Sequence, residues 1–319
     1  MSMASVNATS SSALSLLTGT SRAYESTQVR VATGKSVDKA ADNAAYWSIA
    51  TTMKSSNLSL SSAEDATGLS AAVADTAALG VEQATSIVSD IQSKLILAKA
   101  VGANKDAINT EITQLKSQLS TVAESSSFNG QNWLKLGASE SPKVTSMVSS
   151  VGTDSNGNLA VNVTNFDTAK SVLTSANDAN DGILTRAYTT IAPDGSTSDY
   201  YLLNANSQTP ASPTAQEITI SNSTPNADID GMISATNTML YGLANAGAEI
   251  GATQKTISAN TDFLKDLQDV NTISIGRLTD ANMEEEATKL SSQKVQSQLQ
   301  TIGLNIANSQ QRSVTQLFM

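Results

Sequence analysis

The sequence predicts a mainly α-helical protein: long antiparallel helices from both termini form a coiled-coil bundle, and a small β-rich (α+β) insertion projects outward from the middle. All five prolines lie within residues 142–225, and proline costs about 3 kcal/mol in a helix interior. On both sides of that window apolar residues recur every three or four positions, whereas short runs inside it alternate apolar and polar residues. These are the periods of helices and of strands.

The N-terminal arm carries two runs of apolar residues at helical spacing. The first runs from Val81 to Ala98 and the second from Ile108 to Val122, with steps of three and four residues. Such spacing is typical of helical bundles. Because Gly102–Asn104 interrupts the pattern, we expect two consecutive helices with a break there.

The middle of the chain is predicted to form turns, short strands and one short helix. Alternating residues follow a turn at 155–158, and Pro193 lies in a second expected hairpin turn. The expected strands lie at residues 159–163, 188–191, 200–203 and 217–220. A short helix is expected at 169–176.

The C-terminal arm returns to helical spacing. Apolar residues from Ile233 to Leu264 fall on one register, and Val295 to Ile306 continue it at steps of four, three and four. Many intervening core positions are Ala, Thr, Gln or Gly, so each arm buries little apolar area and should be marginally stable alone. Asp280 or Asn282 is expected to open a helix whose first turn holds three glutamates, with a pair between Glu285 and Lys289.

Composition excludes most catalytic chemistry. The chain has no cysteine and no histidine, which removes disulfides, thiolate nucleophiles and the commonest general base and metal ligand. No phosphate-binding or dinucleotide-binding glycine motif is present. We therefore expect a protein that is not an enzyme, with no catalytic residues, no cofactor and no metal site.

Charge and hydropathy restrict the partners. The 19 basic and 29 acidic residues give a net charge of −10, which argues against nucleic-acid binding. No stretch approaches the ~18 apolar residues of a membrane span, and the N-terminus does not resemble a standard signal peptide. We expect a chain that either stays in the cytoplasm or is secreted without a cleaved signal.

Two weaker features favour structural roles. The stretch Asn177–Gly182 is similar to the start of a calcium loop, but Tyr188 stands where the closing acid is required, so an Asx-rich turn is the better interpretation. Trp47 and Trp133 lie next to helical patterns and are expected to pack at helix junctions.

Both terminal segments carry spaced apolar residues among Ser, Thr, Gln and Asn. Such segments either fray and pair weakly within one chain, or become ordered only when many copies pack together. The spacing alone leaves both readings open. The candidate assembly residues are Leu14, Leu17, Val29, Val31, Leu299, Ile302, Ile306, Leu317 and Phe318.

At these ends the sequence resembles the bacterial flagellins, the subunits of the flagellar filament. Three ordered stretches carry the resemblance: residues 31–50, residues 127–134 and residues 304–318. The sequence Asn-Ala-Ala-Tyr-Trp-Ser-Ile-Ala at residues 43–50 is similar to the corresponding stretch of α-proteobacterial flagellins. The resemblance covers about 1–136 and 228–319, and the middle resembles nothing we can name.

The resemblance implies three parts. Residues 1–44 with 278–319 would form inner-core terminal helices, 45–136 with 228–277 a helical bundle, and 137–227 a variable outer insertion. It implies self-polymerisation into the extracellular filament that acts as a propeller for swimming, after unfolded export through the flagellar channel. The implied partners are copies of the chain, sister flagellins, the export apparatus, an export chaperone, the filament cap and hook-junction proteins.

One departure concerns the vertebrate flagellin receptor. Members detected by it carry a charged motif on the first long helix, and Ser93, Leu95 and Ile96 replace its Arg, Arg and Glu. We expect poor receptor activation, which purified monomer on receptor-reporter cells would test.

Two other functions stay open at this stage. A hook–filament junction protein shares the same terminal helices but caps rather than elongates. A surface binding protein or hydrolase could be housed in residues 137–227, although that segment offers no recognisable site.

Overall fold

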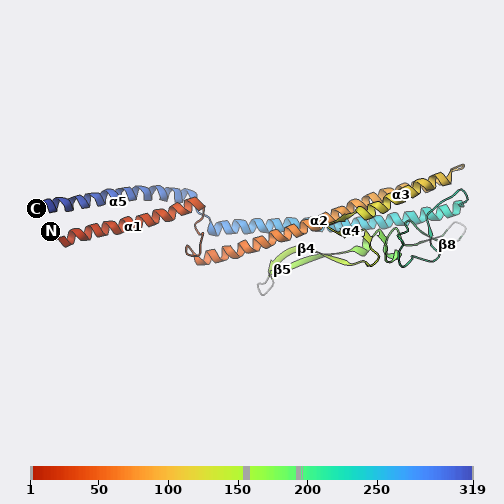
Figure 1. The fold of residues 1–319 in the computed structure, drawn as a ribbon, viewed down its shortest axis with the longest axis horizontal. Coiled ribbons are helices and arrows are strands. Elements are labelled where there is room, and N and C mark those ends of the chain that lie inside the picture. Colours follow the sequence, from red (N-terminus) through yellow and green to blue (C-terminus); the bar gives the residue numbers. More distant parts are fainter. Residues whose placement is uncertain (1–2, 154–158, 192–194, 196, 318–319) are drawn as a thin grey trace. The chain divides into compact units, whose positions relative to one another are not determined.

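A computed structural model describes residues 3–153, 159–191, 195 and 197–317. Its helices belong to two compact units, residues 1–58 with 267–319 and residues 59–266, and both α2 and α4 contribute to each (Figure 1). The helices are α1 (Met3–Thr33), α2 (Ala44–Ala98), α3 (Lys105–Ser125), α4 (Asn226–Thr279) and α5 (Met283–Leu317). The predicted fold class, long helices at both termini around a strand-rich middle, is confirmed.

In the described residues, the named strands lie between α3 and α4. Antiparallel pairs join β1 to β2, β4 to β5 and β7 to β8, and parallel pairs join β3 to β6 and β8 to β9. The strands are β1 (Ser127–Phe128), β2 (Gln131–Asn132), β3 (Lys135–Leu136), β4 (Val144–Thr153), β5 (Leu159–Asp167), β6 (Thr174–Ser175), β7 (Tyr188–Ile191), β8 (Thr197–Tyr201) and β9 (Gln216–Glu217). The 3₁₀ turns are η1 (Thr168–Lys170) and η2 (Ala179–Asp181).

The predicted break in the N-terminal arm is confirmed. Helix α2 ends at Ala98 and α3 begins at Lys105. The Asn104 side chain accepts a hydrogen bond from the Ala107 N–H at 3.2 Å, which caps α3. Gly102 has a φ of +79°, a left-handed conformation that glycine adopts without steric cost.

The core of the second unit contains the predicted apolar seams. Val81, Ile91, Leu95, Ile112 and Leu243 are buried there, together with residues of the insertion. The core is therefore shared between the helical arms and the strand-rich middle.

Trp133 and Gly80 show how closely the insertion packs on the helices. The Trp133 ring is 3% exposed and stacks on Phe166 with ring centroids 4.2 Å apart, which confirms its predicted packing role. A Cβ atom on Gly80 of α2 would come within 2.4 Å of Leu134 Cδ1 and 2.3 Å of Ser126 Oγ. Only glycine permits that approach.

Lys116 fixes β9 against α3. Its Nζ donates to Glu217 Oε1 at 2.8 Å and to the Ile218 carbonyl at 2.5 Å. Burial lowers the pKa of Lys116 below its ordinary value, while the Glu217 carboxylate acts in the opposite direction.

The predicted helix at 169–176 is wrong. Asp167 caps only the short turn η1, where its carboxylate accepts from the Ala169 N–H at 3.0 Å. The chain then turns into β6, because the N–H groups of Leu173 and Thr174 donate to the Leu134 carbonyl at 2.7 and 3.1 Å. Pairing with β3 thus overrides the local helical preference.

Of the other four strand predictions, two are confirmed and two are only partly right. The strands at 159–163 and 188–191 are present; the expected turn at 155–158 and, apart from Gly195, the one that holds Pro193 lie outside the described residues. The strand expected at 200–203 runs from Thr197 to Tyr201, since Leu202 and Leu203 donate to the Leu184 carbonyl instead of the ladder. The strand expected at 217–220 is reduced to Gln216–Glu217.

Candidate assembly surface

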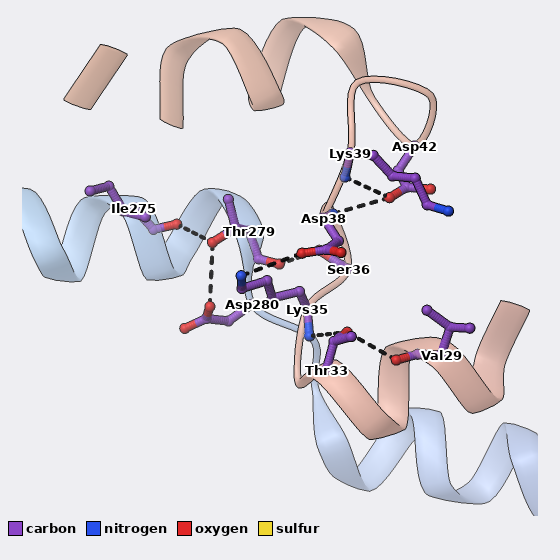
Figure 2. Close-up of polar contacts among 10 residues, drawn as sticks. All are labelled: Val29, Thr33, Lys35, Ser36, Asp38, Lys39, Asp42, Ile275, Thr279 and Asp280. Carbon is purple, nitrogen blue, oxygen red and sulfur yellow. Dashed lines mark hydrogen bonds and ion pairs between the residues drawn. The ribbon is translucent and has the colours of Figure 1, made fainter. Parts of the chain in front are cut away.

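The first unit is organised around the connector between α1 and α2. Gly34 ends α1 with a φ of +71°, and its N–H donates to the Arg30 carbonyl at 2.8 Å. This left-handed glycine after the last turn is a common way for a helix to end. Lys35 then pairs with Asp280 in an antiparallel bridge (Figure 2).

Thr279 at the end of α4 anchors this connector. Its carbonyl accepts the N–H groups of Ser36 at 2.7 Å and Val37 at 3.1 Å. In return, the Ala281 N–H donates to the Gly34 carbonyl at 2.9 Å. The bend between α1 and α2 is therefore hydrogen-bonded to the bend between α4 and α5.

Asp42 closes the connector on itself. Its carboxylate accepts the backbone N–H groups of Asp38 at 3.0 Å and Lys39 at 3.1 Å (Figure 2). These two donors hold the pKa of Asp42 below its usual range. The next residue, Asn43, caps α2 by accepting the Tyr46 N–H at 3.1 Å.

Helix α5 begins with the predicted glutamate-rich turn. Asn282 is the cap, because its side chain accepts the Glu284 N–H at 3.2 Å. The predicted pair between Glu285 and Lys289 is confirmed at 2.8 Å. Glu286 points inward, is buried, and lies 3.6 Å from Arg30 of α1.

Helices α1 and α5 lie side by side and antiparallel (Figure 1), and the seam between them mixes polar and apolar residues. The half-buried and buried positions follow steps of three and four residues along each helix, as packed helices require. On α1 they include Ala13, Leu17, Thr20, Tyr24, Thr27 and Val31. On α5 they are Glu286, Leu290, Gln293, Ser297, Gln300 and Leu304.

Two glutamines lower the stability of the contact between α1 and α5. The Oε1 atoms of Gln293 and Gln300 are buried and have no hydrogen-bond partner among the described residues. A buried acceptor without a partner costs about 1–3 kcal/mol. The contact between α1 and α5 within one chain is therefore weak for its length.

The outward faces of the same two helices carry large apolar residues among polar ones. Exposed fractions are 55% for Leu14 and 48% for Val29 on α1, and 54%, 62%, 55% and 57% for Val295, Leu299, Ile302 and Ile306 on α5. The run from Val295 to Ile306, which spacing alone assigned neither to pairing within the chain nor to contact between copies, is exposed in the single chain. These side chains are exposed, and the half-buried positions between them are Ser297, Gln300 and Leu304. We call the six exposed apolar residues the outward stripe.

The nine predicted assembly residues thus divide into groups. Leu17 and Val31 lie in the seam within the chain. Leu317 is the last residue of α5, and Phe318 lies outside the described residues. The other five belong to the outward stripe: Leu14, Val29, Leu299, Ile302 and Ile306.

A second exposed apolar cluster at the start of α2 was missed. Trp47 is 39% exposed, so the prediction that it packs at a helix junction is wrong, and Tyr46 and Ile49 beside it are also exposed. Tyr46 and Ile49 are three positions apart and share one helical face, which was the available signal for an apolar patch. Val270 and Ile273 of α4 add exposed apolar surface in the same unit.

The receptor-motif positions differ in accessibility. Leu95 is buried in the core of the second unit, whereas Ser93 and Ile96 are exposed. Leu95, which stands in place of the second arginine of the motif, therefore faces the interior. Poor activation of the receptor stays a prediction.

The described residues carry little that points to bound ions or lipids. In this part of the chain there is no cluster of three acidic groups able to hold a metal, and none of its helices is long and apolar enough to cross a bilayer. Asp178 caps η2 by accepting the Asn180 N–H at 2.9 Å, which agrees with an Asx-rich turn.

Both helical arms of the chain match known protein families. Residues 4–137 match the bacterial flagellin N-terminal helical region, and residues 233–318 match the bacterial flagellin C-terminal helical region. The chain is similar to Flagellin C of Rhizobium meliloti (strain 1021), with 40% identity over 98% of each chain. It is 32% identical to Flagellin A of that strain over 98% of each chain, and 32% identical to a flagellin of Brucella melitensis over 99% of each.

Proposed function

The chain belongs to the bacterial flagellin family and is a subunit of the flagellar filament, and we propose that it polymerises through the outward stripe of α1 and α5. One observation carries this proposal. The terminal helices place polar residues such as Gln293 and Gln300 in the seam between them and leave large apolar residues such as Leu299 and Ile302 exposed to solvent. Helices of a stable monomer would be expected to do the reverse.

Contact between copies of the chain would remove the exposed apolar side chains of the stripe from water. Fully burying one large aliphatic side chain contributes roughly 1.5–3 kcal/mol, and the stripe offers six half-exposed ones. A stripe on one copy that packs against a different face of the next copy forms a contact that does not close. Such a contact propagates into a helical polymer.

The three-part division predicted from the sequence is part of this proposal. Residues 1–44 with 278–319 would line the filament interior, 45–136 with 228–277 would form the surrounding bundle, and 137–227 would face outward. Charge supports the order: residues 1–136 hold 10 basic and 11 acidic groups, and 137–227 hold 3 and 8. The segment with the larger net charge, −5 against −1, is the one expected in water.

We further propose that the chain is exported unfolded through the flagellar channel. The seam between α1 and α5 supports this, because a weak contact costs little to open. The absence of cysteine supports it too, because no disulfide can lock the chain in a folded state. The export apparatus, an export chaperone, the filament cap and hook-junction proteins would then be its partners, and its role would be structural rather than enzymatic.

The test is a paired substitution on the outward stripe. Leu299→Ser with Ile302→Ser should leave the monomer helical by circular dichroism, since both side chains are exposed. The critical concentration for growth from seeds should rise at least about 100-fold, from two lost burials. The matched control is Val161→Ser with Val163→Ser, two equally exposed valines of β5.

The outcomes separate the candidate functions. Normal elongation by the stripe variant would contradict the proposed contact. Wild-type chains that cap seeds without extending them would instead indicate a hook–filament junction protein. Growth of long filaments from wild-type monomer supports the filament subunit.

A further inference from the structure

A two-residue turn joins β1 to β2 and holds the sequence Asn129-Gly130. Both residues have a positive φ, +50° for Asn129 and +76° for Gly130. Two central residues of positive φ between paired antiparallel strands identify a type I′ turn, for which Asn-Gly is a preferred sequence. Both residues are exposed, and a Cβ atom on Gly130 would meet no heavy atom beyond its chain neighbours within 4 Å. Water therefore reaches this turn.

An Asn-Gly pair can react with itself. The backbone nitrogen of Gly130 attacks Cγ of Asn129 and forms a bond to it, the bond from Cγ to the side-chain nitrogen breaks, and that nitrogen leaves as ammonia with the proton of the attacking N–H. The product is a five-membered succinimide ring. Water then opens the ring at either carbonyl and leaves aspartate or isoaspartate, so the net change is one water gained and one ammonia lost. Glycine favours the attack, because no Cβ shields its nitrogen.

The folded turn holds the two reacting atoms apart. Ring closure requires the Gly130 nitrogen to lie on the same side of the Cα–C bond as Cβ of Asn129. In a type I′ turn the first central residue has a ψ of about +30°, which places that nitrogen nearly opposite Cβ. The reaction therefore needs the turn to open, although water already reaches it.

Contacts behind the turn oppose its opening. The side-chain N–H of Asn132 donates to the Ala123 carbonyl at 2.8 Å, and Oδ1 of Asn132 accepts the Leu134 N–H at 2.8 Å. Trp133 is 3% exposed and Leu134 is fully buried, both in the core of the second unit. The strand that leaves the turn is thus fixed to α3 and to the core. Opening of the turn is coupled to local unfolding there, which has a free-energy cost of its own.

We propose that Asn129 is a site of spontaneous deamidation, protected in the folded chain and reactive in the unfolded chain. Aspartate at this position keeps the two-residue turn, because Asp, like Asn, tolerates a positive φ. Isoaspartate does not keep it, because the backbone then passes through the former side chain and the turn gains one carbon atom. A chain with isoaspartate at position 129 should therefore refold with a weakened pair of β1 and β2.

Peptide mass spectrometry tests the site in the monomer. Trypsin releases residues 117–135, which contain Asn129 and also Asn132, an internal control because the bulky Trp133 follows it. At one pH, deamidation at Asn129 should be at least about tenfold faster in concentrated urea than in buffer, and Asn132 should stay intact. The isolated peptide should react equally fast in both solvents. No deamidation in urea, or equal rates for the monomer in both solvents, would overturn the proposal.

One variant separates opening of the turn from unfolding of the whole unit. Asn132→Ala removes the contacts behind the turn and should speed deamidation at Asn129 in buffer about threefold to tenfold. The matched control, Asn237→Ala, changes an exposed asparagine of α4 and should leave the rate unchanged. If Asn132→Ala lost its thermal transition, its rate in buffer should equal that of the wild type in urea. An unchanged rate in Asn132→Ala would contradict protection by these contacts.

Refolding after ageing tests the consequence for the fold. Wild-type monomer aged in urea should refold with a lower urea midpoint than fresh monomer. Asn129→Gly has no side-chain amide and still adopts a positive φ, so its midpoint should not change with ageing. Equal losses in both chains would overturn the effect assigned to isoaspartate at position 129.

The consequence in the cell rests on the proposed unfolded export. Chains retained in cells whose flagellar export is blocked should carry more isoaspartate at position 129 than chains taken from filaments. Equal amounts, combined with the rate difference in purified monomer, would contradict a wait in the unfolded state and leave the deamidation site intact. Equal rates in purified monomer would overturn the site itself, whatever the state in which the chain is exported.

Discussion

Single side chains in this protein act mainly where helices begin and connectors bend. Asn43, Asn104 and Asn282 each accept a backbone N–H at the start of a helix. Of these caps, the sequence predicted only the third, as one of two candidates, because the three glutamates after it mark a first helical turn. Asp42 escaped prediction, since its partners are backbone groups of a connector whose path depends on Thr279.

Removal of the Asp42 charge should loosen the connector. Its pKa is depressed in the folded chain by two backbone donors. The stability that it contributes is therefore fully present above its ordinary pKa of 3.8 and is lost as pH falls through the lower folded value. Asp42→Asn should speed hydrogen exchange of residues 34–43 at pH 7 by mass spectrometry and remove the change seen on acidification in the wild type. Asp38→Asn, which leaves the acceptor in place, is the control; equal effects of both variants would contradict this role.

Lys116 and Glu217 should respond unequally to substitution. The Lys116 side chain is 8% exposed and that of Glu217 is 35% exposed. Glu217→Gln leaves a buried cation with a weaker partner and should cost about 1–3 kcal/mol in urea unfolding of the monomer. Lys116→Met removes the charge and keeps the packing, while Glu217 can still reach water, so the loss should be smaller. A larger loss for Lys116→Met would show that the pair itself is the stabilising unit.

At the level of helices and strands, periodicity identified most elements but not their partners. The break at residues 102–104 and the seams of α2, α3 and α4 followed from spacing and capping residues. The run from Val295 to Ile306 has the same spacing, yet it faces outward, because a stripe on a helix does not say which surface will cover it. The segment 169–176 failed for a related reason: its pairing with β3 depends on residues more than thirty positions away.

The glutamines of the seam between α1 and α5 should limit the stability of that pair. Gln293→Leu with Gln300→Leu removes two buried unpaired oxygens and adds apolar area. The pair should gain roughly 2 kcal/mol or more, seen as slower hydrogen exchange across α1 and α5 in the monomer. Gln298→Leu, at an exposed position of α5, should leave exchange unchanged. Faster exchange in the double variant would mean that the glutamines stabilise the seam.

For the molecule as a whole, the sequence separated helical arms from insertion more sharply than the structure does. Met147, Phe166, Leu184 and Ile218 of the insertion are buried in one core with the helices of the second unit. Composition located the insertion correctly through its prolines. It could not reveal that the insertion completes the core, since its buried residues follow no single helical or strand period that would indicate which surface they cover.

Excision of residues 145–222 should therefore unfold the second unit. The deletion removes core side chains whose loss costs several kcal/mol each, more than a domain of ordinary stability can lose. Residues 59–266 should lose protection from hydrogen exchange, while residues 11–33 with 283–304 should keep theirs. A truncated chain that retains a cooperative thermal transition would show that the helices need no insertion to fold.

The central claim is that the outward stripe becomes buried between copies, and thiol labelling tests it most directly. Ile302→Cys supplies a single cysteine on the stripe, and Ile191→Cys supplies one on β7 of the insertion at 74% exposure. Both cysteines should react readily with a maleimide in the monomer. In filaments the reaction at 302 should slow more than about tenfold while that at 191 continues, as expected if only the stripe is covered. Equal reactivity at 302 in monomer and filament would contradict the claim.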